Sequence, residues 1–107
     1  MVDQKTIEKY LNSLGEITKE EIPDEGIILY KTDDKLVGVL ELGKPLRLSL
    51  RCDPELAILL REKYETIMPG HKLNHKFWNT IVLTGQIDWP EIQGFVTLSY
   101  DLVHEQL

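Results

Sequence analysis

The fold is decided by residues 27–52, which read IILYKTDDKLVGVLELGKPLRLSLRC. Three apolar runs, at 27–31, 36–42 and 46–52, are separated by the turn residues at 32–35 and 43–45. Connections of this length are typical of hairpins. The stretch therefore predicts three consecutive antiparallel strands, a β-meander.

The third of these runs alternates strictly between apolar and polar residues. Side chains alternate between the two faces of a strand, so one face should lie on a core and the other should meet water or a partner. The apolar face carries Leu46, Leu48, Leu50 and Cys52, and the polar face carries Arg47, Ser49 and Arg51. Cys52 closes the apolar side and is interpreted as a small buried hydrophobic residue.

Helices are predicted over residues 3–14, from Asp53 onwards, and from Asp88 towards the C-terminus. Each begins with an aspartate, a side chain that commonly caps helices. Gly15 stands where the first helix should end in a left-handed residue. A further strand is predicted over residues 80–84. The order is helix, three strands, helix, one or two strands, helix, which predicts an α+β fold: a two-layer, mostly antiparallel sheet with helices packed on one face.

Length and charge narrow the class of protein. The 107 residues suit one domain spanning 1–107. Lysine and arginine number 12 against 18 aspartates and glutamates, a net charge of −6, whereas a dedicated nucleic-acid binder is usually basic. Any DNA contact would therefore need a local basic patch. Much of the acid lies in Glu16–Glu25, which we predict to be a solvated connector.

The sequence also indicates where the protein resides. The N-terminus does not resemble a secretory signal, and the apolar runs are far shorter than the roughly 20 residues that span a bilayer. Cys52 is the only cysteine, which excludes an internal disulfide and a four-cysteine zinc site. We expect a cytoplasmic protein that does not contact the membrane.

The segment Gly70–Thr80, which reads GHKLNHKFWNT, is the one compact cluster of basic, aromatic and hydrogen-bonding groups. Its two histidines are spaced as helical metal ligands would be, but Pro69-Gly70 before them and a strand after them argue against a helix, and the remaining histidine is His104. There is no nucleophile motif and no glycine-rich phosphate loop. We expect no metal, no cofactor and no enzymatic activity.

A binding surface is the stronger interpretation of the cluster. If residues 71–79 pack beside the polar face of the third strand, their lysines would join its arginines, and their aromatic and amide groups would suit nucleic acid. The candidate binding residues are Arg47, Arg51, Lys72, Asn74, His75, Lys76, Trp78 and Asn79. The alternative is that Trp78 and Phe77 anchor the core, that Asn79 shapes a turn, and that the basic residues form an ordinary solvated face.

Four segments together resemble the MmcQ/YjbR-like family, in the right order and over nearly the whole chain. They are CDPELA at 52–57, LREKY at 60–64, the Gly70–Thr80 cluster with its Trp-Asn-Thr end, and SYDLV at 99–103. The resemblance implies a compact secretion-chaperone-like fold, α-βββ-α-ββ-α, which has been likened to the double-wing motif of a phage transcription factor. It also implies the predicted DNA-binding role usually given to members.

The chain departs from the family pattern in its histidines. Members commonly read His-Leu-Asn-Lys-x-His-Trp, whereas this chain reads KLNHKFW at 72–78. Asn74, Trp78, Asn79 and Thr80 carry over, but a role for a histidine before the tryptophan does not. The segment between the first helix and the first strand is also shorter than in the family.

These observations leave three hypotheses. The first is a non-enzymatic DNA-binding module that uses a local basic patch. The second is a protein-interaction adaptor or secretion-chaperone-like domain, a monomer or weak homodimer, that uses an open sheet face. The third is a small-molecule sensor with a pocket around Trp78 and Tyr100. Convergence of Arg47, Arg51 and the two lysines on one face would favour the first, and scatter would favour the second.

Overall fold

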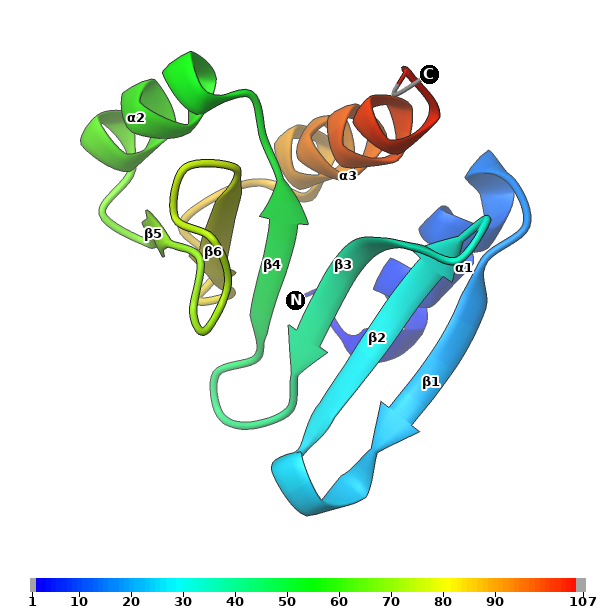
Figure 1. Cartoon of the computed structure of the whole chain (residues 1–107). Helices are drawn as coiled ribbons and strands as arrows, with labels where there is room; N and C mark the ends of the chain where they lie inside the picture. The colour runs from blue at the N-terminus through cyan, green and yellow to red at the C-terminus, as the bar shows by residue number, and fades with distance from the viewer. Residues whose placement is uncertain (1, 106–107) are drawn as a thin grey trace.

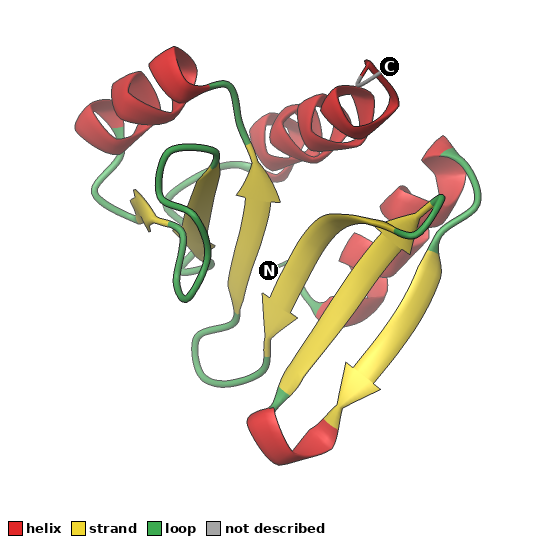
Figure 2. Ribbon diagram, viewed as in Figure 1, coloured by secondary structure: helices red, strands yellow, loops and turns green. Residues whose placement is uncertain are grey.

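The structure is a computed structural model that describes residues 2–105. Its elements are α1 (Gln4–Leu14), β1 (Thr18–Ile22), a short 3-10 helix (Pro23–Glu25), β2 (Ile27–Thr32), β3 (Lys35–Glu41), β4 (Arg47–Arg51), α2 (Pro54–Lys63), β5 (Ile67–Pro69), β6 (Trp78–Val82) and α3 (Trp89–Glu105). The strands form one antiparallel sheet in the order β1-β2-β3-β4-β6-β5. The predicted α+β class and the meander of residues 27–52 are confirmed (Figures 1 and 2).

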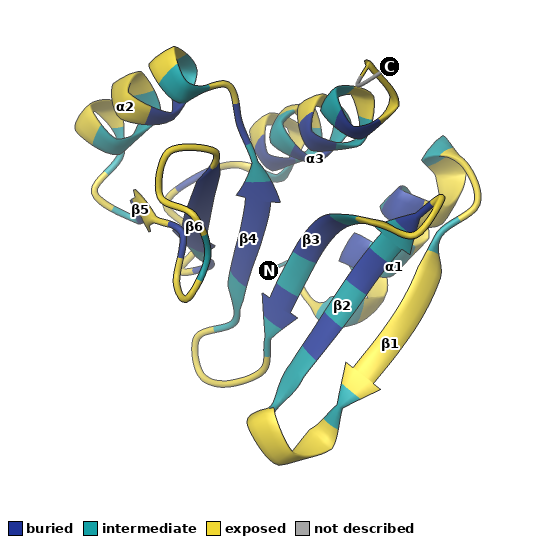
Figure 3. Cartoon of the chain, viewed as in Figure 1, coloured by how far each residue is buried: buried dark blue, intermediate teal, exposed yellow. Residues whose placement is uncertain are grey.

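All three helices pack on one face of the sheet. Helix α1 lies behind β2 in Figure 1, α3 packs on β3 and β4, and α2 packs on β5 and β6. The core lies between the helices and this face, and Figure 3 shows its buried residues in dark blue along the strands and helices. Its fully buried members include Ile7, Leu11, Ile28, Leu40, Leu48 and Ile92. The opposite face of the sheet carries no helix among the described residues.

The prediction that Glu16–Glu25 is a connector is wrong. The segment contains β1, which pairs with β2 from Thr18 opposite Lys31 to Ile22 opposite Ile27, followed by the 3-10 helix. The strand lies at the sheet edge and four of its five residues are exposed. Strand pairing therefore outweighs its acidic composition, helped by a cross-strand ion pair of 3.2 Å between Glu20 and Lys31.

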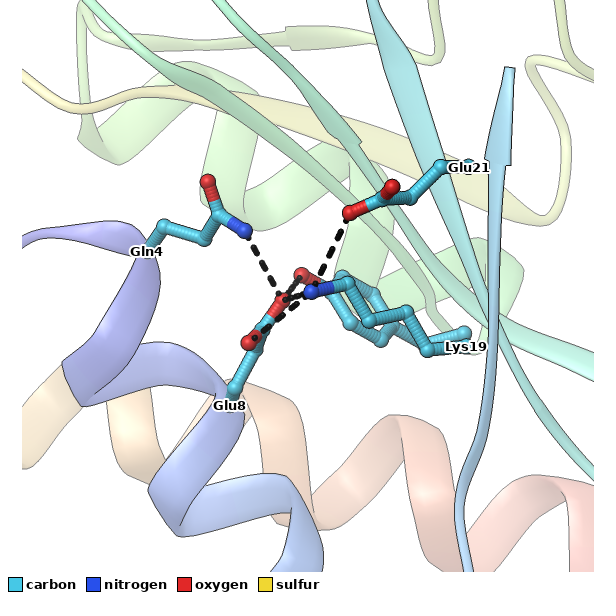
Figure 4. A network of polar contacts seen from close by, with 5 residues as sticks. Gln4, Glu8, Lys19 and Glu21 are labelled. Carbon is cyan, nitrogen blue, oxygen red and sulfur yellow. Dashed lines mark hydrogen bonds and ion pairs between the residues drawn. The ribbon is translucent and has the colours of Figure 1, made fainter. Parts of the chain in front are cut away.

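A polar network fastens the edge strand to helix α1 (Figure 4). Lys19 of β1 lies between Glu8 of α1, at 3.1 Å, and Glu21, at 3.3 Å. The buried Tyr30 donates its hydroxyl hydrogen bond to Glu8 at 2.7 Å, and Gln4 donates a further one at 3.1 Å. Burial alone would raise the pKa of Glu8, but the hydrogen bonds from Tyr30, Lys19 and Gln4 hold that pKa below its ordinary value.

Two details of the helix ends differ from prediction. Asp3 caps α1 as expected, accepting a hydrogen bond of 2.9 Å from the Thr6 amide. Gly15, however, has φ 166°, which is extended and not left-handed. It suits this position because a Cβ there would lie 2.0 Å from the Tyr100 hydroxyl as placed. Asp53 precedes α2, but its side chain makes no capping hydrogen bond, and Pro54 at the first turn starts the helix.

Strands β3 and β4 diverge beyond Gly38, and helix α3 bridges the gap. They pair only from Glu41 opposite Arg47 to Gly38 opposite Leu50. Beyond that point the fully buried Ser99 hydroxyl donates to the Val37 carbonyl at 2.6 Å and accepts from the Arg51 amide at 2.9 Å. These two bonds satisfy backbone groups that the strands no longer satisfy for each other.

Candidate binding site on the open face of the sheet

The open face of the sheet carries a pocket of about 240 Å³. Its floor is built from aliphatic side chains of β2 and β3, which alternation turns away from the helices. These floor residues are Ile27, Leu29, Leu36 and Val39, all of them half-buried. Leu73, from the loop between β5 and β6, adds an apolar wall. In Figure 1 this loop lies in front of β6, on the side opposite α1.

The polar side of the pocket is largely paired within itself. Glu41 and Arg47 form an ion pair of 3.2 Å, and His71 Nε2 lies 3.8 Å from the other Glu41 oxygen. The Ser49 and Thr80 hydroxyls are hydrogen bonded at 2.7 Å. Ser49 is itself buried, so the face of β4 that was predicted to meet water or a partner is partly covered by the protein. The loop before β6 lies beside it, because the His71 amide donates to the Thr80 hydroxyl at 2.9 Å.

Two lining charges take part in no ion pair within residues 2–105. Lys72 lies on the loop side of the pocket, and Glu25, from the 3-10 helix, lies on the β2 side. The apolar floor separates them. The pocket thus presents one cation and one anion at opposite sides of an apolar surface.

The loop of residues 70–77 is held in place by its own hydrogen bonds. The Gly70 amide donates to the Trp78 carbonyl at 3.0 Å, and the Phe77 amide donates to the Asn74 carbonyl at 3.1 Å. The Asn74 side chain accepts from the Lys76 amide at 3.0 Å, and the Arg61 guanidinium of α2 donates to the His75 carbonyl. A loop fixed in this way loses little conformational entropy on binding.

Trp78 and Asn79 lie inside the protein. Trp78 is 5% exposed, with the Arg51 guanidinium 4.9 Å from its ring centroid. Asn79 is 4% exposed; its oxygen accepts from Arg61 Nε at 2.6 Å and its amide donates to the Ala57 carbonyl at 3.2 Å. Trp78 is thus buried at the start of β6, as the alternative interpretation predicted. Asn79 does not shape a turn as that interpretation expected, because it lies within β6 and ties the strand to α2. Phe77, the other predicted core anchor, is 41% exposed.

The four basic candidates come together only in part. Arg47 and Lys72 line the same pocket. Arg51 lies on the same face of β4 but donates from Nε to the Leu36 carbonyl at 2.8 Å. Lys76 is exposed, outside the pocket lining, with its ammonium 5.6 Å from the Phe77 ring centroid. Because Glu41 offsets Arg47, these residues do not make a uniformly positive patch.

The remaining candidates, Asn74 and His75, are exposed on the loop. The described residues contain no group of three or more histidine, cysteine, aspartate or glutamate side chains arranged to hold a metal ion. Cys52 is buried, and burial raises the pKa of its thiol, so the thiolate needed for nucleophilic attack is disfavoured. Across residues 2–105, none of the helices combines the length and apolarity needed to cross a membrane.

The apolar floor was not foreseen from the sequence. Its signal lies in residues 27–30 and 36–40, where apolar residues occupy both faces of the strands. A strand that meets only water on one face alternates more cleanly. Apolar residues on both faces of an uncovered sheet are therefore the feature that indicates a binding surface.

The fold and its open-face pocket define a small α+β protein with one exposed sheet face. Comparison with known proteins identifies its family. The family model YjbR matches residues 13–102, and the chain belongs to this family. It is 34% identical over 71 residues to the Escherichia coli K12 protein named "Uncharacterized protein YjbR", a match covering 65% of this chain and 60% of that protein. The chain thus spans less than two thirds of this relative.

Solved structures agree with this placement. A crystal structure of Deinococcus radiodurans protein DR2400, domain DUF419, has a TM-score of 0.90 and 26% identity, covering 95% of this chain and 78% of that one. A crystal structure of a Pseudomonas syringae protein, structural genomics target PsR293, has a TM-score of 0.81 and 20% identity, covering 94% and 98%. The second likeness is one of fold. The family resemblance of the sequence is confirmed.

Proposed function

We propose that the protein is a non-enzymatic binding module that accepts an apolar side chain of a partner protein in the pocket on its open sheet face. The observation that carries this proposal is the floor of Ile27, Leu29, Leu36 and Val39, which no helix covers among the described residues. Four half-exposed aliphatic side chains around one hollow favour association with an apolar group, because burying them releases water.

The size of the pocket favours a side chain over a larger ligand. Its volume of about 240 Å³ falls below the roughly 300–1,000 Å³ of pockets that enclose drug-sized ligands. Protein interfaces commonly place one aromatic or aliphatic anchor in a hollow of this kind and surround it with polar contacts. The Glu41–Arg47 pair and His71 supply such a polar rim.

DNA binding, which the family resemblance implies, is a second candidate. It is supported by Lys72 and Lys76, which lie exposed on the loop and form no ion pair within residues 2–105. Against it stand the net charge of −6 and the neutralisation of Arg47 by Glu41. The acidic protein as a whole repels phosphate, so the protein partner is the stronger candidate.

Selection from a random peptide display library tests the proposal. Immobilised protein should enrich peptides that share one large apolar residue, and Leu29→Glu, which places a charge on the pocket floor, should abolish their binding. Leu59→Glu is the matched control, because Leu59 is 60% exposed on α2, on the other side of the sheet. Circular dichroism would confirm that both variants fold.

If selected peptides bind the Leu29→Glu variant as well as the wild type, or if Leu59→Glu abolishes binding instead, the pocket is not the site. Titration of labelled duplex and single-stranded DNA at about 50 mM salt examines the second candidate. Binding that disappears in both Lys72→Glu and Lys76→Glu would favour DNA.

A further inference from the structure

We infer that the pocket selects an extended segment whose apolar anchor has a carboxylate on the Lys72 side and a cation on the Glu25 side. This inference rests on the proposed function, since it concerns the segment that the pocket accepts. It follows from the two lining charges that the protein leaves without an ion pair within residues 2–105.

The two charges mark opposite sides of the hollow. Glu25 immediately precedes β2, whereas Lys72 belongs to the loop that leads into β6. Strands β2, β3, β4 and β6 are neighbours in that order. Three strand spacings separate the backbones of β2 and β6, about 14 Å at about 4.8 Å each, and the loop before β6 reaches over part of this gap, since His71 lies 3.8 Å from Glu41 of β3. A ligand that meets both charges must therefore cross the strands and extend over the floor.

The backbone spacing is an upper bound on the gap, and an extended peptide can bridge it. Four residues at about 3.3 Å each cover about 13 Å, and residues two before and two after a central anchor point to the same side as the anchor. One apolar residue with oppositely charged residues at these positions would fill the floor and meet both Lys72 and Glu25. The other lining charges are less available, because Glu41 already engages Arg47 and lies near His71.

The rigidity of the loop supports recognition by charge. Lys72 has φ 59°, a left-handed conformation, in a loop fixed by the bonds of Gly70, Asn74 and Phe77. Its ammonium therefore starts from a defined backbone position, which lowers the entropic cost of pairing it with a ligand carboxylate. Glu25 ends a 3-10 helix whose closing residue, Gly26, donates to the Pro23 carbonyl.

The test uses four capped, fluorescein-labelled nine-residue peptides in a glycine-serine background, each with a central phenylalanine. One has aspartate two residues before it and lysine two residues after it; the others have two serines, two aspartates or two lysines there. Fluorescence anisotropy at low salt should rank the mixed peptide tightest. Each exposed ion pair should contribute about two- to fivefold in affinity.

Charge reversal makes the test specific. Lys72→Glu should shift the preference to the two-lysine peptide, and Glu25→Lys should shift it to the two-aspartate peptide. The matched controls are Lys76→Glu, on the same loop but outside the pocket lining, and Glu62→Lys, on exposed α2. Each control changes the net charge by the same amount as the charge reversal it is matched to, and should leave the affinity ranking of the four peptides unchanged.

The outcomes separate this inference from the proposed function. If the phenylalanine peptides bind, and Leu29→Glu abolishes binding, but charge reversal acts no differently from the controls, the charge selection is refuted and the pocket remains. Free phenylalanine competing as well as the mixed peptide would also overturn it, because a free amino acid would then suffice. If no phenylalanine peptide binds, both the proposed function of the pocket and its selection by charge are refuted.

Discussion

Replacing Ser99 by alanine should destabilise the protein more than its small change in volume suggests. The hydroxyl is fully buried and joins α3 to both diverging strands, through the Val37 carbonyl at 2.6 Å and the Arg51 amide at 2.9 Å. In the alanine variant one backbone acceptor and one backbone donor lose this partner in the protein interior. Water reaches the site poorly because Ser99 has no exposed surface.

The magnitude follows from these two groups. A buried polar group left without its hydrogen-bond partner costs about 1–3 kcal/mol. Allowing for partial relaxation, Ser99→Ala should lower the free energy of unfolding by about 2–4 kcal/mol. The total for a domain is about 5–15 kcal/mol, so the variant should remain folded, with its midpoint lowered by about 10–25 °C.

Urea denaturation followed by tryptophan fluorescence and circular dichroism would measure this loss. Ser13→Ala is the matched control: its hydroxyl donates to the Tyr10 carbonyl at 2.6 Å, but the bond is exposed, so the change should stay within about 0.5 kcal/mol. A loss below about 1 kcal/mol for Ser99→Ala, with an unchanged denaturant slope, would refute the argument that α3 supplies bonds that β3 and β4 lack.

Three further predictions concern Glu8, Asn79 and Cys52. The pKa of Glu8 is lowered in the folded state, so the ionised carboxylate stabilises the fold above its unfolded pKa of 4.5, and this stabilisation is lost as pH falls through the folded pKa. Glu8→Gln should therefore flatten the fall in the free energy of unfolding between about pH 5 and 3. An unchanged pH profile would contradict this. Asn79→Ala should lower the free energy of unfolding in urea by about 1–3 kcal/mol, because Arg61 Nε loses its acceptor and the Ala57 carbonyl loses a donor. A cost near that of an exposed Asn74→Ala variant would show that the pairing is dispensable. Cys52 is buried with a raised thiol pKa, so iodoacetamide at neutral pH should modify it slowly in the native protein and rapidly in denaturant, and equal rates would mean that the thiol is accessible.

The elements that bury a periodic apolar face were predictable from the sequence. The three strands of residues 27–52 and the helices starting near Asp3, Asp53 and Asp88 all lie where the pattern placed them. Strand β1 was not predictable in the same way, because an edge strand exposed on both faces has no alternation to detect. Its formation depends on pairing with β2.

The candidate site was predictable only in outline. Packing of residues 71–79 beside the polar face of the third strand was considered, and the structure brings His71, Lys72 and Leu73 of that segment to one pocket with Arg47. The pairing of Arg47 with Glu41, the tether from Arg51 to Leu36 and the burial of Asn79 were not anticipated. Each depends on the register between strands distant in sequence, which residue type alone does not determine.

The acidic edge strand also bears on how the protein avoids aggregation. A free sheet edge offers unpaired amides and carbonyls to any other extended chain. Along β1 the charged Lys19, Glu20 and Glu21 would all have to lose water before a second chain could pair with it. The opposite edge, β5, is three residues long and ends in Pro69, which has no amide hydrogen to donate. Both edges of the sheet thus carry features that disfavour pairing with a further strand, while its open face carries the pocket.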